Sequence, residues 1–345
     1  MRIAIDAMGG DNAPDEIVRG VLDAAPEVPN ATLILVGQRD KLESRVQGFK
    51  NVVVQHASEV VEMREDPGRA LRSKPDSSIR VGLSMVKSGR ADAIISAGNT
   101  GALVGGATVP LLGLGSLEGV KRPGIAIPFP TEKGFCALLD AGANKNTKAV
   151  HLLQYAVMGS VYIKHLRKDL GDPKIALLNI GEERNKGTDV HKEAHVLLEK
   201  AFPNFIGNIE PHKVYGGAAD VVVTDGFTGN IFLKASEGMS SFLMGMIRSN
   251  GLAHSADIQK SVERVEARTD YSVYGGAPLL GCNGIVMKCH GRSKAMAIKN
   301  AVKVAAEFIH DRLNQWIVAE LQKYHTRRSW LSWFGGGSKD EEPEA

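Results

Sequence analysis

Several features are scarce in this chain of 345 residues, and each scarcity excludes a class of protein. Only three cysteines occur, Cys136, Cys282 and Cys289, and none of them forms a Cys-x-x-Cys pair. Neither a disulfide framework nor a structural zinc site is therefore expected, and the thiols are best explained as small buried side chains in a reducing compartment. The net charge is only +3, from 42 basic and 39 acidic residues, which provides no general attraction for nucleic acid. Any anion site must be local.

Long hydrophobic runs are also scarce. Residues 93–117 carry no charge, but glycines recur through them and Pro110 interrupts them. We therefore predict a strand, a loop and a buried helix of small residues there, rather than a membrane span. Met1 and Arg2 lead directly into a short apolar segment, so we expect no signal peptide.

What the chain does contain is a regular alternation of short apolar runs and longer amphipathic segments. The apolar runs are continuous, as in buried parallel strands, and the amphipathic segments have a helical period. The predicted strands are Arg2–Asp6, Thr32–Val36, Val52–Val54, Ala91–Ile95, Phe135–Leu139, Lys174–Leu178 and Ala219–Thr224. The predicted helices are Pro14–Ala25, His151–Lys168, His191–Lys200, Asn230–Arg248 and Ser293–Tyr324. This alternation predicts a doubly wound α/β fold.

No linker rich in proline or serine divides the chain, so we expect one α/β catalytic domain over residues 1–326, with two lobes as an open alternative. Residues 327–345 differ in composition. They begin with arginines and aromatic residues and end in an acidic run. We expect a tail there whose last residues are disordered.

Two distant segments resemble each other. Residues 92–102 and residues 220–230 each contain an acid, a buried strand, a hydroxyl residue, Gly-x-Thr-Gly and the start of a helix. Glycine lets the backbone turn tightly and approach a ligand, and a helix start offers unpaired N–H groups with a partial positive charge. The pattern predicts two equivalent strand-to-helix turns, each suited to phosphate.

Three more loops follow predicted strands, at residues 6–11, 140–144 and 179–187. Ligands of open α/β sheets bind beyond the carboxyl ends of the strands, so we expect these loops and the two turns to converge on one edge. A single glycine-rich loop is usually an ordinary turn, but the set predicts an anion or phosphate site. A nucleotide site is only weakly indicated, because GxxxxGK[ST] is absent and neither turn has the first glycine of GxGxxG.

Six segments together resemble the bacterial acyl-ACP:phosphate acyltransferases. They follow the order of that family from residue 1 to about residue 310, and as a set they are specific although no single one is. The segments are residues 1–14, 95–102, 139–144, 155–160, 224–230 and 274–277.

This resemblance implies a three-layer fold related to isocitrate and isopropylmalate dehydrogenases and to phosphotransacetylases. It also implies a homodimer without metal or organic cofactor. The implied reaction moves a fatty acyl chain from acyl carrier protein to inorganic phosphate. The implied setting is phospholipid synthesis in the cytoplasm, with peripheral membrane association and transfer of the acyl phosphate to a membrane glycerol-3-phosphate acyltransferase.

That chemistry requires control of charge more than acid–base help. Phosphate is already nucleophilic, and a thiolate leaves readily because a thiol pKa is about 8.5. The site must hold an anion against a carbonyl and stabilise the tetrahedral oxyanion.

Lys186 and Asn230 are the residues to which we assign the catalytic roles. Lys186 matches a lysine of the family on the loop after residue 178 and would neutralise phosphate or the oxyanion. Asn230 begins a helix and would orient phosphate or the carbonyl. From the residues alone, an exposed loop lysine and an ordinary helix cap are the alternatives.

The predicted phosphate-binding residues come from the two echoing turns, and four further residues are predicted to support them. The phosphate-binding set is Gly98, Asn99, Thr100, Gly101, Thr228 and Gly229. The supporting set is Asp6, Asp140, Asp225 and His290. For the aspartates helix capping is an equal alternative, and for His290 a purely structural role is the alternative.

Two surfaces suggest contacts with other molecules. Residues 231–252 hold more large apolar side chains than one core face requires, which suits a dimer interface or an acyl-chain groove. Trp330 and Trp333 lie beside Arg327 and Arg328, which favours a membrane interface, with docking onto the chain's own domain as the alternative.

Three other functions remain open from the sequence. A phosphotransacetylase would use acyl-CoA by the same mechanism. An NAD-dependent dehydrogenase of the related fold would need a nicotinamide signal and metal-binding acids, and neither arrangement is visible. A non-catalytic fatty-acid or acyl-ACP binding protein would not need Lys186.

Overall fold

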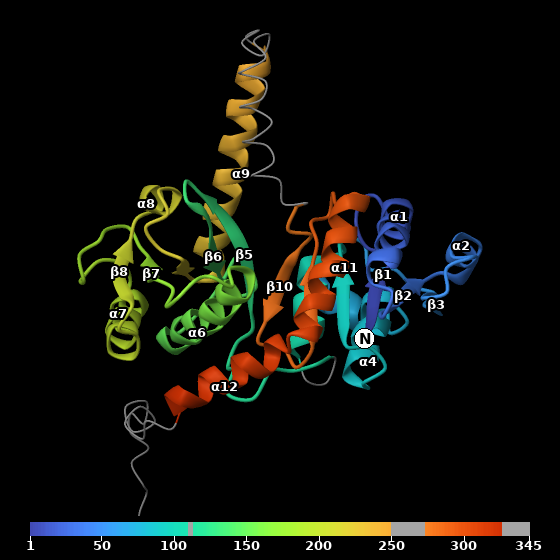
Figure 1. Cartoon of the computed structure of the whole chain (residues 1–345), viewed down its shortest axis with the longest axis horizontal. Helices are drawn as coiled ribbons and strands as arrows, with labels where there is room; N and C mark the ends of the chain where they lie inside the picture. Colours follow the sequence, from blue (N-terminus) through green and yellow to red (C-terminus); the bar gives the residue numbers. More distant parts are fainter. Residues whose placement is uncertain (110–112, 250–272, 326–345) are drawn as a thin grey trace, which may run out of the picture.

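One mixed β-sheet runs through the computed structural model, which describes residues 1–109, 113–249 and 273–325 (Figure 1). Among these residues it has eleven strands in the order β3-β2-β1-β4-β11-β10-β5-β6-β9-β7-β8. The strands are β1 Arg2–Asp6, β2 Thr32–Gly37, β3 Val52–His56, β4 Ala93–Ser96, β5 Gly124–Thr131, β6 Gly134–Leu139, β7 Ile175–Leu178, β8 Phe205–Ile209, β9 Val221–Val223, β10 Ala277–Leu280 and β11 Ile285–Lys288. Most are fully buried apolar runs, because helices cover both faces.

The helices form the two outer layers. They are α1 Asp15–Ala24, α2 Arg39–Leu42, α3 Pro67–Ser73, α4 Ser78–Lys87, α5 Thr100–Thr108, α6 Ala149–Leu166, α7 Asp189–Ala201, α8 Pro211–Tyr215, α9 Gly226–Ser249, α11 Ala295–His310 and α12 Leu313–His325. Helices α1, α6, α7, α11 and α12 pack on one face through one continuous apolar core. On the other face α3, α4 and α5 cover the first half, and α8 and α9 cover the second. The prediction of a doubly wound, three-layer α/β fold is confirmed.

The direction of the strands divides the sheet into two halves. Strands β1, β2, β3, β4 and β11 are parallel to one another, and so are β6, β7, β8 and β9. Three antiparallel pairs, β11 with β10, β10 with β5 and β5 with β6, lie between these groups and reverse the direction. The expectation that all the loops share one edge of a parallel sheet is therefore wrong, because the loops after β1 and β4 and those after β6, β7 and β9 end oppositely directed strands.

The seven predicted strands are all present, but one predicted helix is wrong. Residues Ser293–Tyr324 form two helices, α11 and α12, rather than one. The chain turns at Arg312, whose φ of 55° lies in the left-handed region that interrupts a helix. The helical period continues on both sides of this break, which is why the sequence pattern did not reveal it.

Strand β5 was missed because Pro128 and Pro130 argue against a strand. Both prolines pair with β6, opposite Ala137 and Phe135. On its other side, the described pairing of β5 with β10 involves only Gly124 and Ile125. The prolines therefore lie beyond the stretch where β5 has strands on both sides.

Two predictions about membranes and the tail can be placed against the structure. Among the described helices none is both long and apolar enough to cross a bilayer. The tail, residues 327–345, lies outside the described residues, as do Trp330 and Trp333.

Candidate functional site

The turn from β9 into α9 is held together by Asp225. One carboxylate oxygen of Asp225 accepts the N–H groups of Phe227 at 3.0 Å and Thr228 at 2.9 Å, and the other accepts the Thr228 hydroxyl at 2.7 Å. The N–H of Gly226 donates to the carbonyl of Asn144 at 2.8 Å. Asp225 is thus the cap of α9. Thr228 was predicted to bind phosphate, but both its hydroxyl and its N–H donate to the Asp225 carboxylate.

Asp140 is the buried platform beneath this turn. Its Oδ1 accepts N–H groups from Ile125, Gly142 and Ala143, at 2.9 to 3.0 Å. Its Oδ2 accepts the backbone N–H of Asn144 at 2.8 Å and the side-chain amide of Asn144 at 2.9 Å. Burial raises the pKa of the Asp140 carboxyl, and these hydrogen bonds oppose the rise. Asp140 organises the loop after β6 rather than facing a ligand.

Asn230 lies against that same loop. A Cβ placed on Gly142 would be 3.5 Å from the Asn230 side chain, so the amide sits directly over the loop that Asp140 orders. Asn230 is exposed. Gly229 also approaches this loop, since a Cβ there would lie 2.0 Å from the Asp140 carbonyl oxygen. Glycine at this position lets α9 start in direct contact with the loop, and Asn230 is then free to face outward.

The turn from β4 into α5 rests on Asp6 in the corresponding way. Asp6 ends β1 and is buried, and its Oδ2 accepts the Ser96 hydroxyl at 2.6 Å. Ser96 in turn accepts the N–H of Gly98 at 3.0 Å, and Met8 donates to Asp6 Oδ1 at 3.2 Å. Burial raises the pKa of the Asp6 carboxyl. In both halves a buried aspartate therefore ends one strand and supports the turn that follows the neighbouring parallel strand.

Asn99 is buried, and its side chain is fully engaged. Its Oδ1 accepts the N–H of Ala102 at 3.0 Å and caps α5. Its amide nitrogen donates to the carbonyls of Glu62 and Met63 at 3.2 Å and of Glu65 at 3.0 Å. The Asn99 side chain thus ties the preceding loop to the turn, and the prediction that Asn99 binds phosphate then depends on its backbone N–H.

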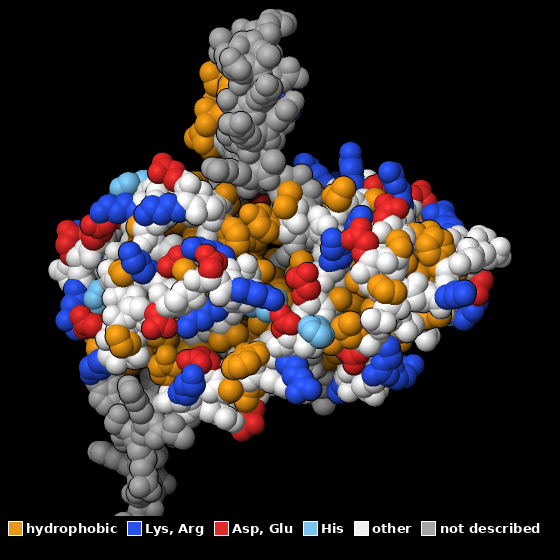
Figure 2. Space-filling view, in the orientation of Figure 1, with side chains coloured by type: hydrophobic (Ala, Val, Ile, Leu, Met, Phe, Trp, Pro, Cys, Tyr) orange, Lys and Arg blue, Asp and Glu red, His pale blue; other side chains and the backbone are white. Residues whose placement is uncertain are grey.

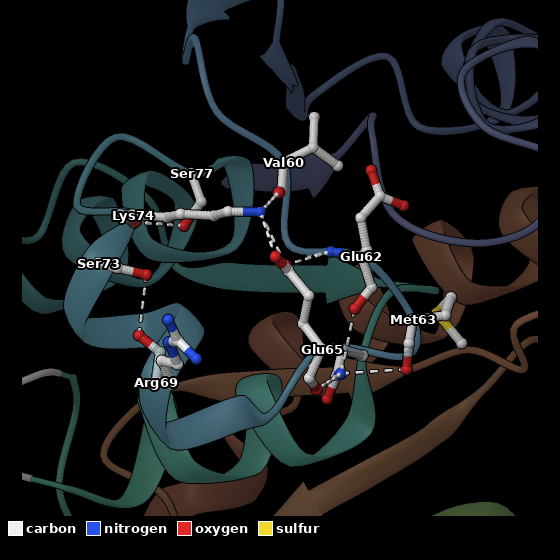
Figure 3. Close-up of polar contacts among 9 residues, drawn as sticks. Val60, Glu62, Met63, Glu65, Arg69, Ser73, Lys74 and Ser77 are labelled. Carbon is white, nitrogen blue, oxygen red and sulfur yellow. Dashed lines mark hydrogen bonds and ion pairs between the residues drawn. The ribbon is translucent and has the colours of Figure 1, made fainter.

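That loop is tied down a second time, as Figure 3 shows. The Lys74 ammonium donates to the Val60 carbonyl at 2.7 Å and to the Glu65 carboxylate at 2.7 Å. Glu65 also accepts the N–H of Glu62 at 2.9 Å. Residues 60–65 thus form an ordered wall beside the start of α5.

The backbone of this first turn still has donors to offer. The described hydrogen bonds use the N–H groups of Gly98, Ala102 and Leu103, and none within the described residues uses those of Asn99, Thr100 or Gly101. A Cβ on Gly101 would lie 2.5 Å from the Pro67 ring, so α3 packs closely over one side. Consecutive N–H groups at a helix start are the usual donors for an anion.

The described contacts of Lys186 are with residues of its own loop rather than with either turn. It is exposed, and its ammonium is 3.8 Å from a carboxylate oxygen of Glu183 on the same loop. The Lys186 carbonyl accepts the Asn179 amide at 3.1 Å, which shapes the loop after β7. No described contact joins Lys186 to Asn230. His191, at the start of α7, is close enough to Asp225 for the carboxylate to oppose the burial-driven fall in the imidazole pKa. The catalytic assignment of Lys186 stays a prediction.

Lys288, which was not singled out from the sequence, ends β11, and His290 follows two residues later. The His290 ring accepts the N–H of Arg292 at 3.1 Å. Burial lowers the pKa of His290, and the nearby Lys234 of α9 lowers it further. The ammonium of Lys288 is also within electrostatic range of Lys234. A charged residue ending a buried apolar run was the available sequence signal for Lys288.

Helix α9 therefore connects the two halves of the site. Its first turn packs on the loop after β6, through Gly226, Gly229 and Asn230. Its third turn brings Lys234 near the residues at the end of β11. Although the strands of the two halves run in opposite directions, loops from both halves thus meet around the base of α9 (Figure 1).

Comparison with known proteins places this architecture in a family. A family model described as a fatty acid synthesis protein matches residues 1–316. The chain is 44% identical over 338 residues to a phosphate acyltransferase of Pelotomaculum thermopropionicum, covering 95% of this chain and 97% of that protein. The chain belongs to the phosphate acyltransferase family. A phosphate acyltransferase of Heliobacterium modesticaldum is also 44% identical, over 336 residues.

Solved structures support the fold assignment for this phosphate acyltransferase family member. A phosphotransacetylase from Streptococcus pyogenes aligns with a TM-score of 0.59 at 18% identity, covering 90% of this chain and 94% of that chain. A branched-chain phosphotransacylase from Enterococcus faecalis aligns with a TM-score of 0.52 at 14% identity, covering 90% and 99%. These similarities establish a shared fold.

Proposed function

We propose that this protein transfers a fatty acyl chain from acyl carrier protein to inorganic phosphate. A phosphate oxygen attacks the thioester carbonyl, a C–O bond forms, the C–S bond breaks, and the carrier leaves as a thiolate that takes up a proton. Membership of the phosphate acyltransferase family supports acyl transfer with phosphate. The choice of acyl carrier protein as the donor rests on the resemblance in motifs.

The observation that carries the proposal is the start of α5. It presents the N–H groups of Asn99, Thr100 and Gly101, next to a buried strand end and a wall of ordered loop. Such an arrangement holds a dianion without a cluster of arginines. Phosphate bound there would be fixed by backbone donors, which neither titrate nor change rotamer.

The remaining roles follow from the other half of the site. Asn230 is exposed over the Asp140-ordered loop, where its amide could donate to the thioester carbonyl as negative charge develops on the oxygen. Lys186 has a long, exposed side chain on the loop after β7. Its ammonium is 3.8 Å from a Glu183 carboxylate oxygen, and it would reach the oxyanion when substrate binds. Asp6, Asp140 and Asp225 are positioning residues that shape the two turns.

The proposed partners are a second copy of the chain and a membrane acyltransferase that accepts the acyl phosphate, such as one that acylates glycerol 3-phosphate. One observation supports an apolar contact surface. Helix α9 projects from the body of the protein with hydrophobic side chains exposed along it (Figures 1 and 2). They are Phe227, Ile231, Met239, Phe242, Leu243 and Met246. Surface of this kind fits a homodimer interface or peripheral contact with a membrane.

The test is a reaction of the purified protein with palmitoyl-acyl carrier protein and phosphate. Release of the carrier thiol and trapping of acyl phosphate by hydroxylamine should both require phosphate, and Lys186→Ala and Asn230→Ala should lower turnover. Palmitoyl-CoA as the donor is the matched comparison. Faster reaction with the CoA thioester would favour the phosphotransacetylase alternative, and binding of acyl carrier without acyl phosphate would favour a binding protein.

A further inference from the structure

Lys288 ends β11, which lies between β4 and β10 in the sheet. In the register it lies beside Ser96, the residue that links Asp6 to Gly98. The next residue along, Cys289, donates its N–H to the Ser96 carbonyl at 2.9 Å. Lys288 is therefore on the strand adjacent to the one that leads into the α5 turn.

Several loops converge at this strand end. The N–H of Asp11 donates to the Gly291 carbonyl at 2.8 Å, which joins the loop after β1 to the loop after β11. A Cβ on Gly291 would lie 2.8 Å from the Met63 methyl, and the Met63 carbonyl is held by Asn99. The loop after β11 thus borders the same ordered wall as the start of α5.

The ammonium of Lys288 has few hydrogen-bond partners among the described residues, although several loops surround it. The Cys289 carbonyl accepts from it, and no carboxylate of the described residues lies within ion-pair distance. Asp6 already accepts the Ser96 hydroxyl on one oxygen and the Met8 N–H on the other. An ammonium has three donors, so two remain for another acceptor.

Charged groups of both signs lie near Lys288, but none of the described carboxylates forms an ion pair with its ammonium. Asp6 and Asp11 are near enough to favour the ammonium electrostatically, and Lys234 of α9 opposes it. Burial is the largest influence and lowers the pKa of Lys288 to about 8, so the group is still mostly charged at neutral pH. A desolvated cation with spare donors gains most from an anion that brings its own acceptors.

We propose that Lys288 is a phosphate-binding residue, whose ammonium contacts the phosphate held by the N–H groups of Asn99, Thr100 and Gly101. This role rests on the proposed function and adds to it a side-chain cation from the first half of the site. Lys186 and Asn230, from the second half, then act on the acyl group, while Lys288 acts on the nucleophile.

Calorimetric titration of the full-length protein with inorganic phosphate tests the proposal. Lys288→Met should weaken phosphate binding by about tenfold or more, since it removes a charge-assisted hydrogen bond, and Lys288→Arg should retain most of the affinity. Lys41→Met, which removes an exposed lysine of α2, is the matched control and should bind like the wild type. Thermal melting checks that each variant folds, and Lys288→Gln replaces Lys288→Met if the latter does not.

Proton uptake provides a second readout. If phosphate contacts the ammonium, binding near pH 8.5 should take up protons in the wild type and not in Lys288→Met, as measured in buffers of different ionisation enthalpy. A folded Lys288→Met that binds phosphate like the wild type would overturn the proposal, whether or not acyl phosphate is made. Lysine-dependent phosphate binding without acyl phosphate formation would instead overturn only the proposed reaction.

Discussion

The two echoing turns differ in what they leave unpaired. Both start a helix after a buried strand, and both rest on an aspartate at the end of the adjacent parallel strand, Asp6 for the first and Asp140 for the second. In the second turn, Asp225 and the Asn144 carbonyl take up the N–H groups of residues 226–228. In the first, the Asn99 side chain caps the helix by accepting from Ala102, and no hydrogen bond among the described residues uses the N–H groups of residues 99–101. Similar sequence motifs thus yield one turn whose N–H groups are used within the protein and one turn that leaves such donors available, as the proposed phosphate site requires.

The largest expected effect on stability comes from Asp140, which holds the loop beneath the second turn. Asp140→Ala removes the acceptor of five hydrogen-bond donations and should lower the free energy of unfolding by about 3 to 5 kcal/mol. The Asp6 carboxylate accepts fewer hydrogen bonds, so Asp6→Ala should lower the free energy of unfolding by about 1 to 3 kcal/mol. Denaturation in urea measures both. Equal losses would mean that the two aspartates support their turns to the same extent.

Two glycines, Gly229 at the start of α9 and Gly105 in α5, test the same difference between the two turns. Gly229→Ala would place a Cβ 2.0 Å from the Asp140 carbonyl oxygen, so the backbone must shift, and a loss of about 2 to 4 kcal/mol is expected. In α5, Gly105→Ala meets its nearest atom, Leu71 Cδ1, at 3.6 Å and should stabilise the helix by about 0.5 to 1 kcal/mol. Urea denaturation of the two variants decides whether close approach at Gly229 is required.

Lys288 should give the first turn a dependence on pH that the second lacks. Its pKa is about 8 in the folded protein and about 10.4 in an unfolded chain, so the unfolded state binds more protons between these values. Stability should therefore rise with pH from about 8 to 10, by about 1 to 3 kcal/mol relative to Lys288→Met. Unfolding of both proteins across this range measures the difference, and a constant difference would contradict a lowered pKa.

The smallest effects compare the caps. Asn99→Ala loses a cap and three contacts to carbonyls and should cost about 2 kcal/mol, together with disorder of residues 60–65. Thr228→Val removes only the hydroxyl bonded to Asp225 and should cost less than about 1 kcal/mol. Proteolysis near residue 65 together with melting temperature tests this order. A greater loss for Thr228→Val would reverse the roles of the turns.

The fold class could be predicted from the sequence because each buried strand is a short continuous apolar run, which is a local pattern. Arg2–Asp6 has the predicted bounds, and α6 and α7 differ from prediction by about a turn or less. Strand direction is not local: the reversal between the halves depends on β5 and β10, whose prolines hid them. The expected single edge failed for that reason.

The sequence predicted the strand-to-helix turns of the candidate site, but not the contacts that their side chains make. The turns at Gly98 and Gly226 are strand-to-helix turns, as expected. Whether Asn99 and Thr228 face a ligand or the backbone depends on tertiary hydrogen bonds, which residue type cannot reveal. Lys288 was overlooked because its significance lies in neighbours from three other segments, and no spacing in the sequence connects them.

The pairing between β5 and β10 limits how far the backbone ladder is continuous between the two halves of the sheet. Within the part of the chain that the structure describes, β10 pairs with β5 at two positions, Leu279 with Ile125 and Leu280 with Gly124. Proline cannot donate to a ladder, and Pro128, Pro130 and Pro278 stand where this pairing would otherwise lengthen. The β5–β10 ladder therefore cannot extend past these prolines, and the backbone pairing between the two halves of the sheet stays short at this point.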